Sequence, residues 1–241
     1  MTHELSRSFG HRTVTPEERR ARVQRVFTAV APRYDLMNDL MSLGIHRLWK
    51  RSFARMAAPR AGQIIVDVAG GTGDIARLLA GPARQVTVCD ASVAMISAGR
   101  RRGAAGIGWL AGEAERIPLA DASVDTVTIA FGIRNATHLD RALAEMARVL
   151  KPGGRLLCLE FSTPAAPLRP FYRAFSSTVI PALGALVARN PEAYVYLVES
   201  IRRFPDQREF QAMFEAAGLV GVRFRNLSFG IACIHEGSKP A

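Results

Sequence analysis

Short apolar segments alternate with helical patterns between residues 63 and 162, and this alternation most constrains the fold. The apolar segments are "QIIVDVA", "QVTVCD", "GIGWLAG", "VDTVTIAFG" and "GRLLCLEFS", and the helical patterns include "GDIARLLA", "SVAMISAGRR" and "LDRALAEMARVL". Continuously apolar strands separated by helices are typical of a parallel sheet that helices cover on both faces. We therefore expect an α/β fold with a doubly wound sheet.

The flanking segments predict additions to this sheet within one domain, residues 1–241. Residues 1–60 are expected to form a helical cap, with a helix over 16–31 that Thr15 caps and a second helix over 36–57. Residues 61–163 form the predicted core, and the proline-punctuated segment 164–205 predicts a helical insertion. Residues 206–241 predict a final helix and an antiparallel strand pair, which gives seven strands, six parallel and one antiparallel.

Charge and cysteine usage limit the setting in which the chain works. The net charge is +11, from 32 basic and 21 acidic residues, and nucleic acid, an anionic membrane face or an acidic partner could meet such a surface. The basic run "RRARVQR" is interpreted as a solvated helix face, because no aromatic residue is interleaved with it. Three widely spaced cysteines and a polar N-terminus predict a cytoplasmic protein with free thiols.

The stretch "VDVAGGTGD" (66–74) lies where an open α/β sheet places its ligand, at the carboxyl end of the first strand of the core. Gly70, Gly71 and Gly73 let the backbone approach a ligand closely. The loop also satisfies a loose G-x-G-x-x-A, with Asp90 where a dinucleotide fold has its ribose-binding acid. An NAD-dependent oxidoreductase is therefore one alternative.

Two acidic residues favour a different adenosine compound. Asp67 and Asp74 flank the glycines, and their negative charges would repel a pyrophosphate at the helix N-terminus. S-adenosylmethionine has no phosphate but carries a sulfonium and an ammonium, which carboxylates attract. Asp90 could accept hydrogen bonds from both ribose hydroxyls, and Glu113 with Ala114 could meet the adenine at the end of the third strand. These residues predict a site for the methyl donor.

Further motifs narrow this prediction to a family. The segments are "YDLMNDLMSLGIHRLWK", "AGGTGD", "FGIRN", "RVLKPGGRLLCLEFS" and "YVYLVESIRRFPDQ". Together they resemble the ubiquinone/menaquinone biosynthesis C-methyltransferases, which are class I S-adenosylmethionine-dependent enzymes of Rossmann-like fold. The resemblance covers residues 20–237. It implies donor contacts at Thr72, Asp90, Glu113 and Ala114, and at Ala130, where some members have Ser.

The resemblance also implies the reaction, which is C-methylation of a polyprenylated benzoquinol or of demethylmenaquinol. Only the reduced, electron-rich ring should attack the sulfonium methyl. Arg134 and Asn135 follow the fourth strand and are expected to orient the quinol oxygen or a proton-accepting water. His46 is a third catalytic candidate, in an N-terminal signature with Tyr34, Asp35, Asn38 and Trp49. Glu160, Tyr194, Tyr196, Glu199 and Arg202 are further candidates for the acceptor pocket.

The expected partners follow from the quinol. Its prenyl tail would explain the apolar stretch at 174–188, which is too short to span a membrane but could touch the inner membrane face. Contacts with other enzymes of the quinone pathway are also plausible. No residue grouping has zinc-ligand spacing, so no metal is expected. An RNA methyltransferase or nucleic-acid-binding protein is the second alternative, although no nucleic-acid partner is expected.

Overall fold

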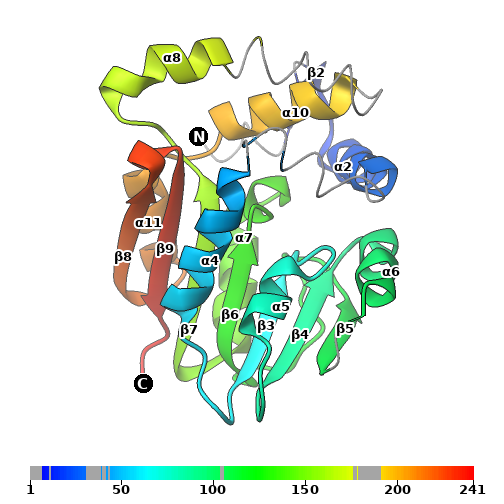
Figure 1. Cartoon of the computed structure of the whole chain (residues 1–241), viewed down its shortest axis with the longest axis vertical. Helices are drawn as coiled ribbons and strands as arrows, with labels where there is room; N and C mark the ends of the chain where they lie inside the picture. The colour runs from blue at the N-terminus through cyan, green and yellow to red at the C-terminus, as the bar shows by residue number, and fades with distance from the viewer. Residues whose placement is uncertain are drawn as a thin grey trace.

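A seven-stranded sheet forms the centre of the molecule (Figure 1). The computed structural model describes residues 7–10, 12–30, 39, 42, 44–103, 106–175, 178 and 191–241. The strand order is β5-β4-β3-β6-β7-β9-β8. These strands are β3 (Ile64–Val68), β4 (Gln85–Asp90), β5 (Ile107–Ala111), β6 (Val124–Ala130), β7 (Leu150–Phe161), β8 (Val220–Leu227) and β9 (Ala232–Ser238).

All strands of this sheet except β9 run in the same direction. The pairs β3·β4, β4·β5, β3·β6 and β6·β7 are parallel, whereas β9 is antiparallel to both β7 and β8. The predicted arrangement of six parallel strands and one antiparallel strand is therefore confirmed. A separate hairpin of β1 (Ser8–Phe9) and β2 (Arg12–Thr13) belongs to the N-terminal cap.

Helices bury apolar residues against both faces of the sheet. On one face, α4 (Ile45–Ala57) and α5 (Asp74–Leu79) pack Phe53 and Leu79 against strand residues such as Ile65. On the other face, α7 (Leu139–Val149) and α11 (Gln207–Ala216) bury Leu143 and Phe214. Neighbouring residues of β3 point to opposite faces, which is why its sequence is apolar except for the buried Asp67. α6 (Val93–Arg101) covers the β4–β5 edge.

A helical cap lies beyond the carboxyl ends of the parallel strands (Figure 1). It contains α2 (Pro16–Val30), α8 (Arg169–Ala174) and α10 (Pro191–Arg202). The N-terminus of α2 forms where predicted, because the Thr15 hydroxyl accepts from the Glu18 N–H and the Glu18 carboxylate accepts from the Thr15 N–H. The fold class is thus as expected, with a helical cap and an insertion before the last two strands.

The second N-terminal helix differs from its prediction. The helix α4 begins only at Ile45, because Gly44 has φ 76° and interrupts any helix that enters from residue 42. The helical spacing of the sequence predicts that Leu48 and Phe53 face inward; Phe53 is buried, but Leu48 is 60% exposed, and Trp49 and Lys50 are buried along with Phe53. The expected helical positions 36–38, 40, 41 and 43 lie outside the described residues.

The chain reverses its progress across the sheet between β3 and β6. It moves outward from β3 through β4 to β5 and then returns to pair β6 with β3. Such a switch point opens a crevice at the carboxyl ends of the strands. Ala69 follows β3 with φ 49° and Phe131 follows β6 with φ 55°, a left-handed conformation that non-glycine residues rarely adopt. The crevice is therefore the natural place to look for function.

Membrane crossing sets a minimum on the length and apolar character of a helix. Within the described ranges, no helix meets both the required length and the required apolar character.

Candidate active site

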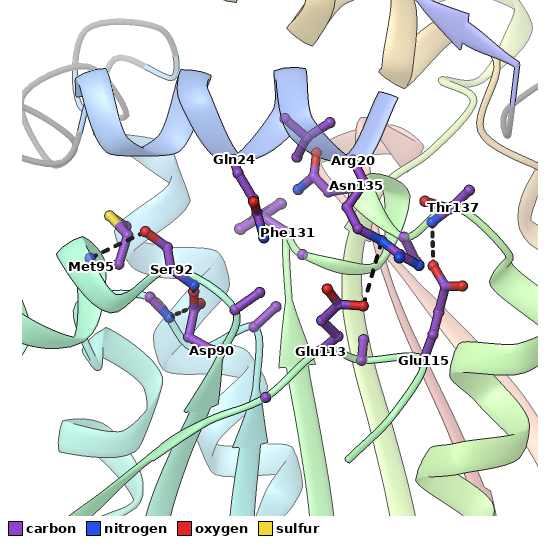
Figure 2. A pocket seen from close by; sticks show the side chains of 18 residues that line it. Arg20, Gln24, Asp90, Ser92, Met95, Glu113, Glu115, Phe131, Asn135 and Thr137 are labelled. Atoms are coloured by element: carbon purple, nitrogen blue, oxygen red, sulfur yellow. Dashed lines mark hydrogen bonds and ion pairs between the residues drawn. The ribbon is translucent and has the colours of Figure 1, made fainter. Parts of the chain in front are cut away.

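A cavity of about 130 Å³ lies over the ends of β3, β4 and β6 and beneath α2 (Figure 2). We call it the donor-side cavity. Its walls are the loops after these three strands, the segment 112–115 after β5, and one face of α2. The lining residues are Arg20, Val23, Gln24, Ala69, Gly71, Asp90, Ala91, Ser92, Met95, Gly112, Glu113, Ala114, Glu115, Phe131, Gly132, Asn135, Ala136 and Thr137.

Asp90 is fixed in this cavity by two backbone groups. Its Oδ2 accepts from the Gly71 N–H and its Oδ1 from the Ser92 N–H, both at 2.8 Å. Burial raises the pKa of the carboxyl, although both hydrogen bonds oppose the shift. Each oxygen keeps a lone pair, so a carboxylate here can still accept from two neighbouring hydroxyls. The geometry suits the diol of a ribose.

Acidic residues also form the opposite wall of the donor-side cavity. Glu113 lies 3.5 Å from Nε of Arg20, which reaches down from α2 (Figure 2). Glu115 turns aside and accepts from the backbone N–H groups of Thr137 and His138, at 2.5 and 3.1 Å. The side chain of Gln24 points from α2 toward Phe131 in the same view. The helix therefore acts as a roof over the cavity.

A second, smaller space of about 30 Å³ lies inside the glycine loop, and we call it the loop cavity. Asp67 lines it, is fully buried and accepts from the Thr128 hydroxyl at 2.8 Å. A Cβ at Gly70 would lie 2.6 Å from Oδ2 of Asp67, so only glycine fits there. That oxygen has no hydrogen-bond partner within the described part of the chain. Burial raises the pKa of Asp67 to about 7.

The role expected for Asp74 needs correction. Its carboxylate bonds Nζ of Lys50 and a terminal nitrogen of Arg77, each at 2.8 Å. Burial would raise the pKa of Asp74, but the two cations hold it below its ordinary value. The negative charge is thus compensated by the protein, so Asp74 is not a free attractant for a cationic ligand. The sequence did not reveal that Lys50 would reach it from α4.

A third cavity of about 660 Å³ lies between α4, the loop after β6 and the inserted helices. We call it the acceptor-side cavity, and most of its walls are apolar or aromatic. The lining residues are Ser42, Gly44, Ile45, His46, Leu48, Trp49, Lys50, Phe131, Arg134, Phe161, Leu168, Phe171, Tyr172, Phe175, Leu197, Ile201, Ser228 and Ile231.

Three aromatic rings line one region of the acceptor-side cavity. The ring centroids of Phe131 and Phe161 are 4.8 Å apart, and Trp49 lies 6.2 Å from Phe131 and 6.1 Å from Phe161. The Trp49 indole N–H donates to the Ser228 hydroxyl at 2.9 Å, which fixes the ring. Such a cluster offers faces on which a planar ring can stack.

Arg134 is the principal charged group of this cavity. One of its terminal nitrogens donates to Glu160 at 2.7 Å and to the Phe131 carbonyl at 2.6 Å. Its guanidinium also lies 5.4 Å from the centroid of the Phe161 ring. Burial raises the pKa of Glu160, which Arg134 opposes. Glu160 itself does not line the cavity, so its contact with the site runs through Arg134.

His46 adds a titratable group to the acceptor-side cavity. Its Nδ1 is 2.7 Å from the Ser42 hydroxyl, and its Nε2 is 3.8 Å from Oδ1 of Asp39. Burial lowers the pKa of His46, and the nearby charge of Lys50 lowers it further. The imidazole is therefore neutral near pH 7 and retains a lone pair that can accept a proton.

Phe131 lines all three cavities. The structure therefore brings most of the expected residues around one side chain. Gly71, Asp90, Glu113, Ala114 and Asn135 line the donor-side cavity, and Asp67, Gly70, Gly71, Thr72 and Ala130 line the loop cavity. Arg134 and His46 line the acceptor-side cavity. Gly73 lines none of them and is instead the N-cap residue of α5.

Other expected residues lie elsewhere or were missed. Tyr34, Asp35 and Asn38 lie outside the described residues, as does the side chain of Tyr194. Tyr196 donates to Oδ1 of Asn135 at 2.9 Å, and α10 lines the acceptor-side cavity through Leu197 and Ile201 rather than through Tyr196, Glu199 or Arg202. Sequence reasoning overlooked Gln24, Lys50 and Tyr172; only the rarity of lysine in this chain could have drawn attention to Lys50.

Comparison with known proteins agrees with this geometry. The model of the ubiE/COQ5 methyltransferase family matches residues 13–239. The chain belongs to the ubiE/COQ5 methyltransferase family. The protein named "Ubiquinone/menaquinone biosynthesis C-methyltransferase UbiE" from Rubrivivax gelatinosus is 67% identical over 98% of this chain and 94% of that protein. Its namesake from Paracoccus denitrificans is 51% identical, with 96% of each covered.

Solved structures of other methyltransferases have the same fold as this chain. A methyltransferase from Thermotoga maritima, described as dependent on S-adenosylmethionine, matches with a TM-score of 0.67 and 21% identity, over 90% of this chain and 99% of that one. Phosphoethanolamine N-methyltransferase 2 of Haemonchus contortus, solved with S-adenosylmethionine, has a TM-score of 0.62 and 15% identity, over 80% of this chain and 52% of that one. The chain is a C-methyltransferase whose methyl donor is S-adenosylmethionine, and the NAD-dependent alternative is set aside.

Proposed function

We propose that this enzyme methylates a ring carbon of a polyprenylated quinol in respiratory quinone biosynthesis. The acceptor is 2-methoxy-6-polyprenyl-1,4-benzoquinol, demethylmenaquinol, or both. The names of the close relatives support this assignment. One structural observation carries it, namely that Phe131 lines both a small cavity with several charged and polar side chains, which suits the donor, and a larger, mostly apolar cavity, which suits a prenylated ring.

The two cavities match their ligands chemically. In the donor-side cavity, Asp90 holds the ribose and the segment at Glu113 and Ala114 contacts the adenine, while Asp67 in the loop cavity attracts the ammonium of the donor. The acceptor-side cavity receives the ring against Trp49 and Phe161. The sulfonium methyl then lies beside Phe131, at the boundary between the two ligands.

The reaction needs an electron-rich acceptor and a place for one proton. The ring carbon attacks the methyl group, a C–C bond forms, the C–S bond breaks, and S-adenosylhomocysteine leaves as a neutral thioether. The proton of that carbon then passes through water to the phenolic oxygen, which restores the aromatic quinol, and the phenolic proton lost before the transfer is the one proton released overall. Loss of a phenolic proton beforehand increases the electron density of the ring, so a residue that stabilises phenolate accelerates the transfer.

Arg134 stabilises the phenolate in this proposal. Its guanidinium is a planar cation that faces a cavity from which apolar side chains exclude much of the water. His46 accepts the phenolic proton, directly or through a water, because its lowered pKa keeps the imidazole neutral. Asn135 faces the donor side, where the Tyr196 hydroxyl fixes its amide. It therefore positions the donor rather than the quinol.

Apolar side chains around the mouth of the acceptor-side cavity support contact with a membrane. Leu48 and Phe171 line the cavity yet are 60% and 73% exposed, and Phe229, beside the lining residue Ser228, is 78% exposed. Inserting such side chains into a bilayer contributes about 1.5–3 kcal/mol each. Exposed arginines on the same helices, Arg51 and Arg169, favour an anionic lipid surface. We assign this rim as a peripheral docking face through which the prenyl tail enters.

Methyl transfer to defined acceptors tests the proposal. Radiolabelled S-adenosylmethionine is offered with reduced demethylmenaquinol, with the reduced methoxy-polyprenyl-benzoquinol, with each oxidised quinone, and with RNA. We expect label in one or both quinols and none in the quinones or RNA. Label in RNA alone, or in no acceptor despite measurable donor binding, would overturn the quinol assignment and leave the methyltransferase fold intact.

A further inference from the structure

Arg19 is almost completely buried, although it belongs to the basic run that the sequence assigned to a solvated helix face. Only 1% of its surface is exposed. Its guanidinium donates to the backbone carbonyls of Arg134, Asn135 and Ala136 at 3.0, 2.9 and 2.8 Å, and to the Ser8 carbonyl at 3.2 Å. The solvated-face interpretation is therefore wrong for this residue.

The partners of Arg19 are unusual for a buried charge. No carboxylate forms an ion pair with Arg19 within the ranges the structure describes; backbone carbonyls alone satisfy it. Burying a guanidinium without a counter-ion is costly, so the arrangement is expected only where it serves something besides stability. Three of the four carbonyls belong to or directly follow the short helix η2 (Ile133–Asn135), whose C-terminal end carries partial negative charge.

The helix η2 connects the two halves of the proposed site. Arg134 faces the acceptor-side cavity, whereas the next residue, Asn135, faces the donor-side cavity. The helix that carries Arg19 is α2, which roofs the donor-side cavity with Arg20, Val23 and Gln24. A single guanidinium thus joins the roof of the donor site to the peptide that carries both proposed active-site side chains.

We propose that Arg19 is a positioning residue that couples closure of α2 over the methyl donor to the placement of Arg134. When α2 closes, the Arg19 fork fixes the three carbonyls of residues 134–136 and orders the guanidinium of Arg134 for the quinol. When α2 moves to exchange donor for product, the same bonds break and the acceptor side loses its order. This coupling rests on the proposed function, because it assigns the donor and acceptor to these cavities.

Arginine variants on α2 provide the test. Arg19→Ala removes the fork, and Arg25→Ala is the matched control, because Arg25 is exposed on the same helix and bonds only the Ala21 carbonyl within it. Arg20→Ala tests the roof alone. For each variant, calorimetry gives the Kd of S-adenosylhomocysteine, and turnover at saturating donor gives kcat for the reduced quinol. Melting temperatures monitor the fold.

The coupling predicts a combination that a merely structural residue would not give. In Arg19→Ala, the Kd of S-adenosylhomocysteine rises and kcat falls, each by about tenfold, because charge-assisted hydrogen bonds are lost. Millimolar guanidinium should partly restore the kcat of Arg19→Ala. It should leave the kcat of Arg25→Ala unchanged, because that variant has lost no contact to the site. Arg20→Ala raises Kd, because Arg20 lines the donor-side cavity, whereas Arg25→Ala leaves both Kd and kcat close to the parent values.

A conservative variant decides the matter if Arg19→Ala does not fold. Arg19→Lys keeps the charge but loses the planar fork, so it should fold and show an intermediate loss in both Kd and kcat. Parent-like Kd and kcat in Arg19→Lys, or a lowered melting temperature alone in Arg19→Ala, would overturn the proposal. Since product binding needs no quinol, the Kd comparison remains informative even if the quinol proves to be the wrong acceptor.

Discussion

The two sides of Phe131 differ in how they are built. The donor side is small and carries several charged and polar side chains, and backbone N–H groups fix its key carboxylate, Asp90. The acceptor side is about five times larger by cavity volume, 660 against 130 Å³, and is largely apolar, with Arg134 and Lys50 as buried cations. The contrast indicates that the donor is held by directed hydrogen bonds, whereas the acceptor is held by shape and burial, with one charge that acts on the reaction itself.

If this contrast is correct, damage on the acceptor side should affect turnover and leave donor binding intact. Arg134→Lys keeps a cation beside Glu160 but loses the planar fork. We expect kcat to fall about 10²–10³-fold, as when a charge-stabilising donor is removed from an active site. The Kd of S-adenosylhomocysteine should stay within about twofold of the parent value. Methyl-transfer assays and calorimetry measure the two quantities.

The exposed α7 residue Arg141 offers a matched control for this substitution. Arg141→Lys should behave like the parent enzyme in both measurements. A parent-like kcat in Arg134→Lys would show that the guanidinium of Arg134 does not stabilise charge in the reaction. It would then contradict the proposed difference between the donor side and the acceptor side of Phe131.

The converse experiment removes a donor-side carboxylate. Asp90→Asn loses one of the oxygens that hold the Gly71 and Ser92 N–H groups and the ribose. The donor Kd should rise by about tenfold or more, since buried donors are left unpaired. At saturating donor, kcat should recover to within a fewfold of the parent, which calorimetry and turnover assays can check. If Asp140→Asn on the exposed part of α7 weakened donor binding equally, the effect would not belong to the site.

The loop cavity predicts a pH dependence confined to the donor side. With a pKa raised to about 7, Asp67 is protonated in the free protein at lower pH, and the folded state loses stability as the pH rises toward that value. A bound ammonium favours the ionised carboxylate, so it competes with the proton. The affinity for S-adenosylhomocysteine should therefore fall as the pH is lowered from about 7.5 to about 5.5, on either side of that pKa.

The variant Asp67→Asn isolates this titration, because its amide carries no charge in this pH range. We expect its affinity for S-adenosylhomocysteine to be weaker and nearly independent of pH. A parent enzyme whose affinity is flat across the same range would contradict an ionic role for Asp67.

The smallest expected effect concerns the mouth of the acceptor-side cavity. Leu48→Ser with Phe171→Ser should raise the KM for a long-tailed quinol in anionic vesicles several-fold, because less apolar surface enters the bilayer. The KM for a short-tailed, water-soluble quinol should hardly change. The double variant Val93→Ser with Val220→Ser provides the control, since these side chains are 65% and 51% exposed and do not line the cavity. Equal losses in both double variants would contradict the docking face.

The donor side was the more predictable half of the molecule. Its residues lie at strand ends that the apolar pattern locates, so Asp67, Asp90 and Glu113 could be placed from the sequence alone. The six-plus-one strand arrangement followed from the same pattern. What could not be predicted locally was the compensation of Asp74 by Lys50, because the two residues come from different helices.

The acceptor side could not be assembled from local sequence. Its walls come from six segments spread between residues 42 and 231, and no spacing rule connects Trp49 with Ser228. Helical periodicity also misplaced Leu48, since Gly44 resets the start of α4 and rotates its buried face. Arg19 was misread for a related reason, because three of the four carbonyls that accept from its guanidinium lie more than a hundred residues away.

The most direct measurement is a crystal structure with S-adenosylhomocysteine and a short-tailed oxidised quinone, which cannot accept the methyl group. We expect the thioether sulfur beside Phe131, the ribose on Asp90, and the quinone ring between Phe161 and Arg134, with the ring and the sulfur facing each other beside Phe131. A ring bound on the donor side of Phe131, or on a surface remote from Arg134, would contradict it.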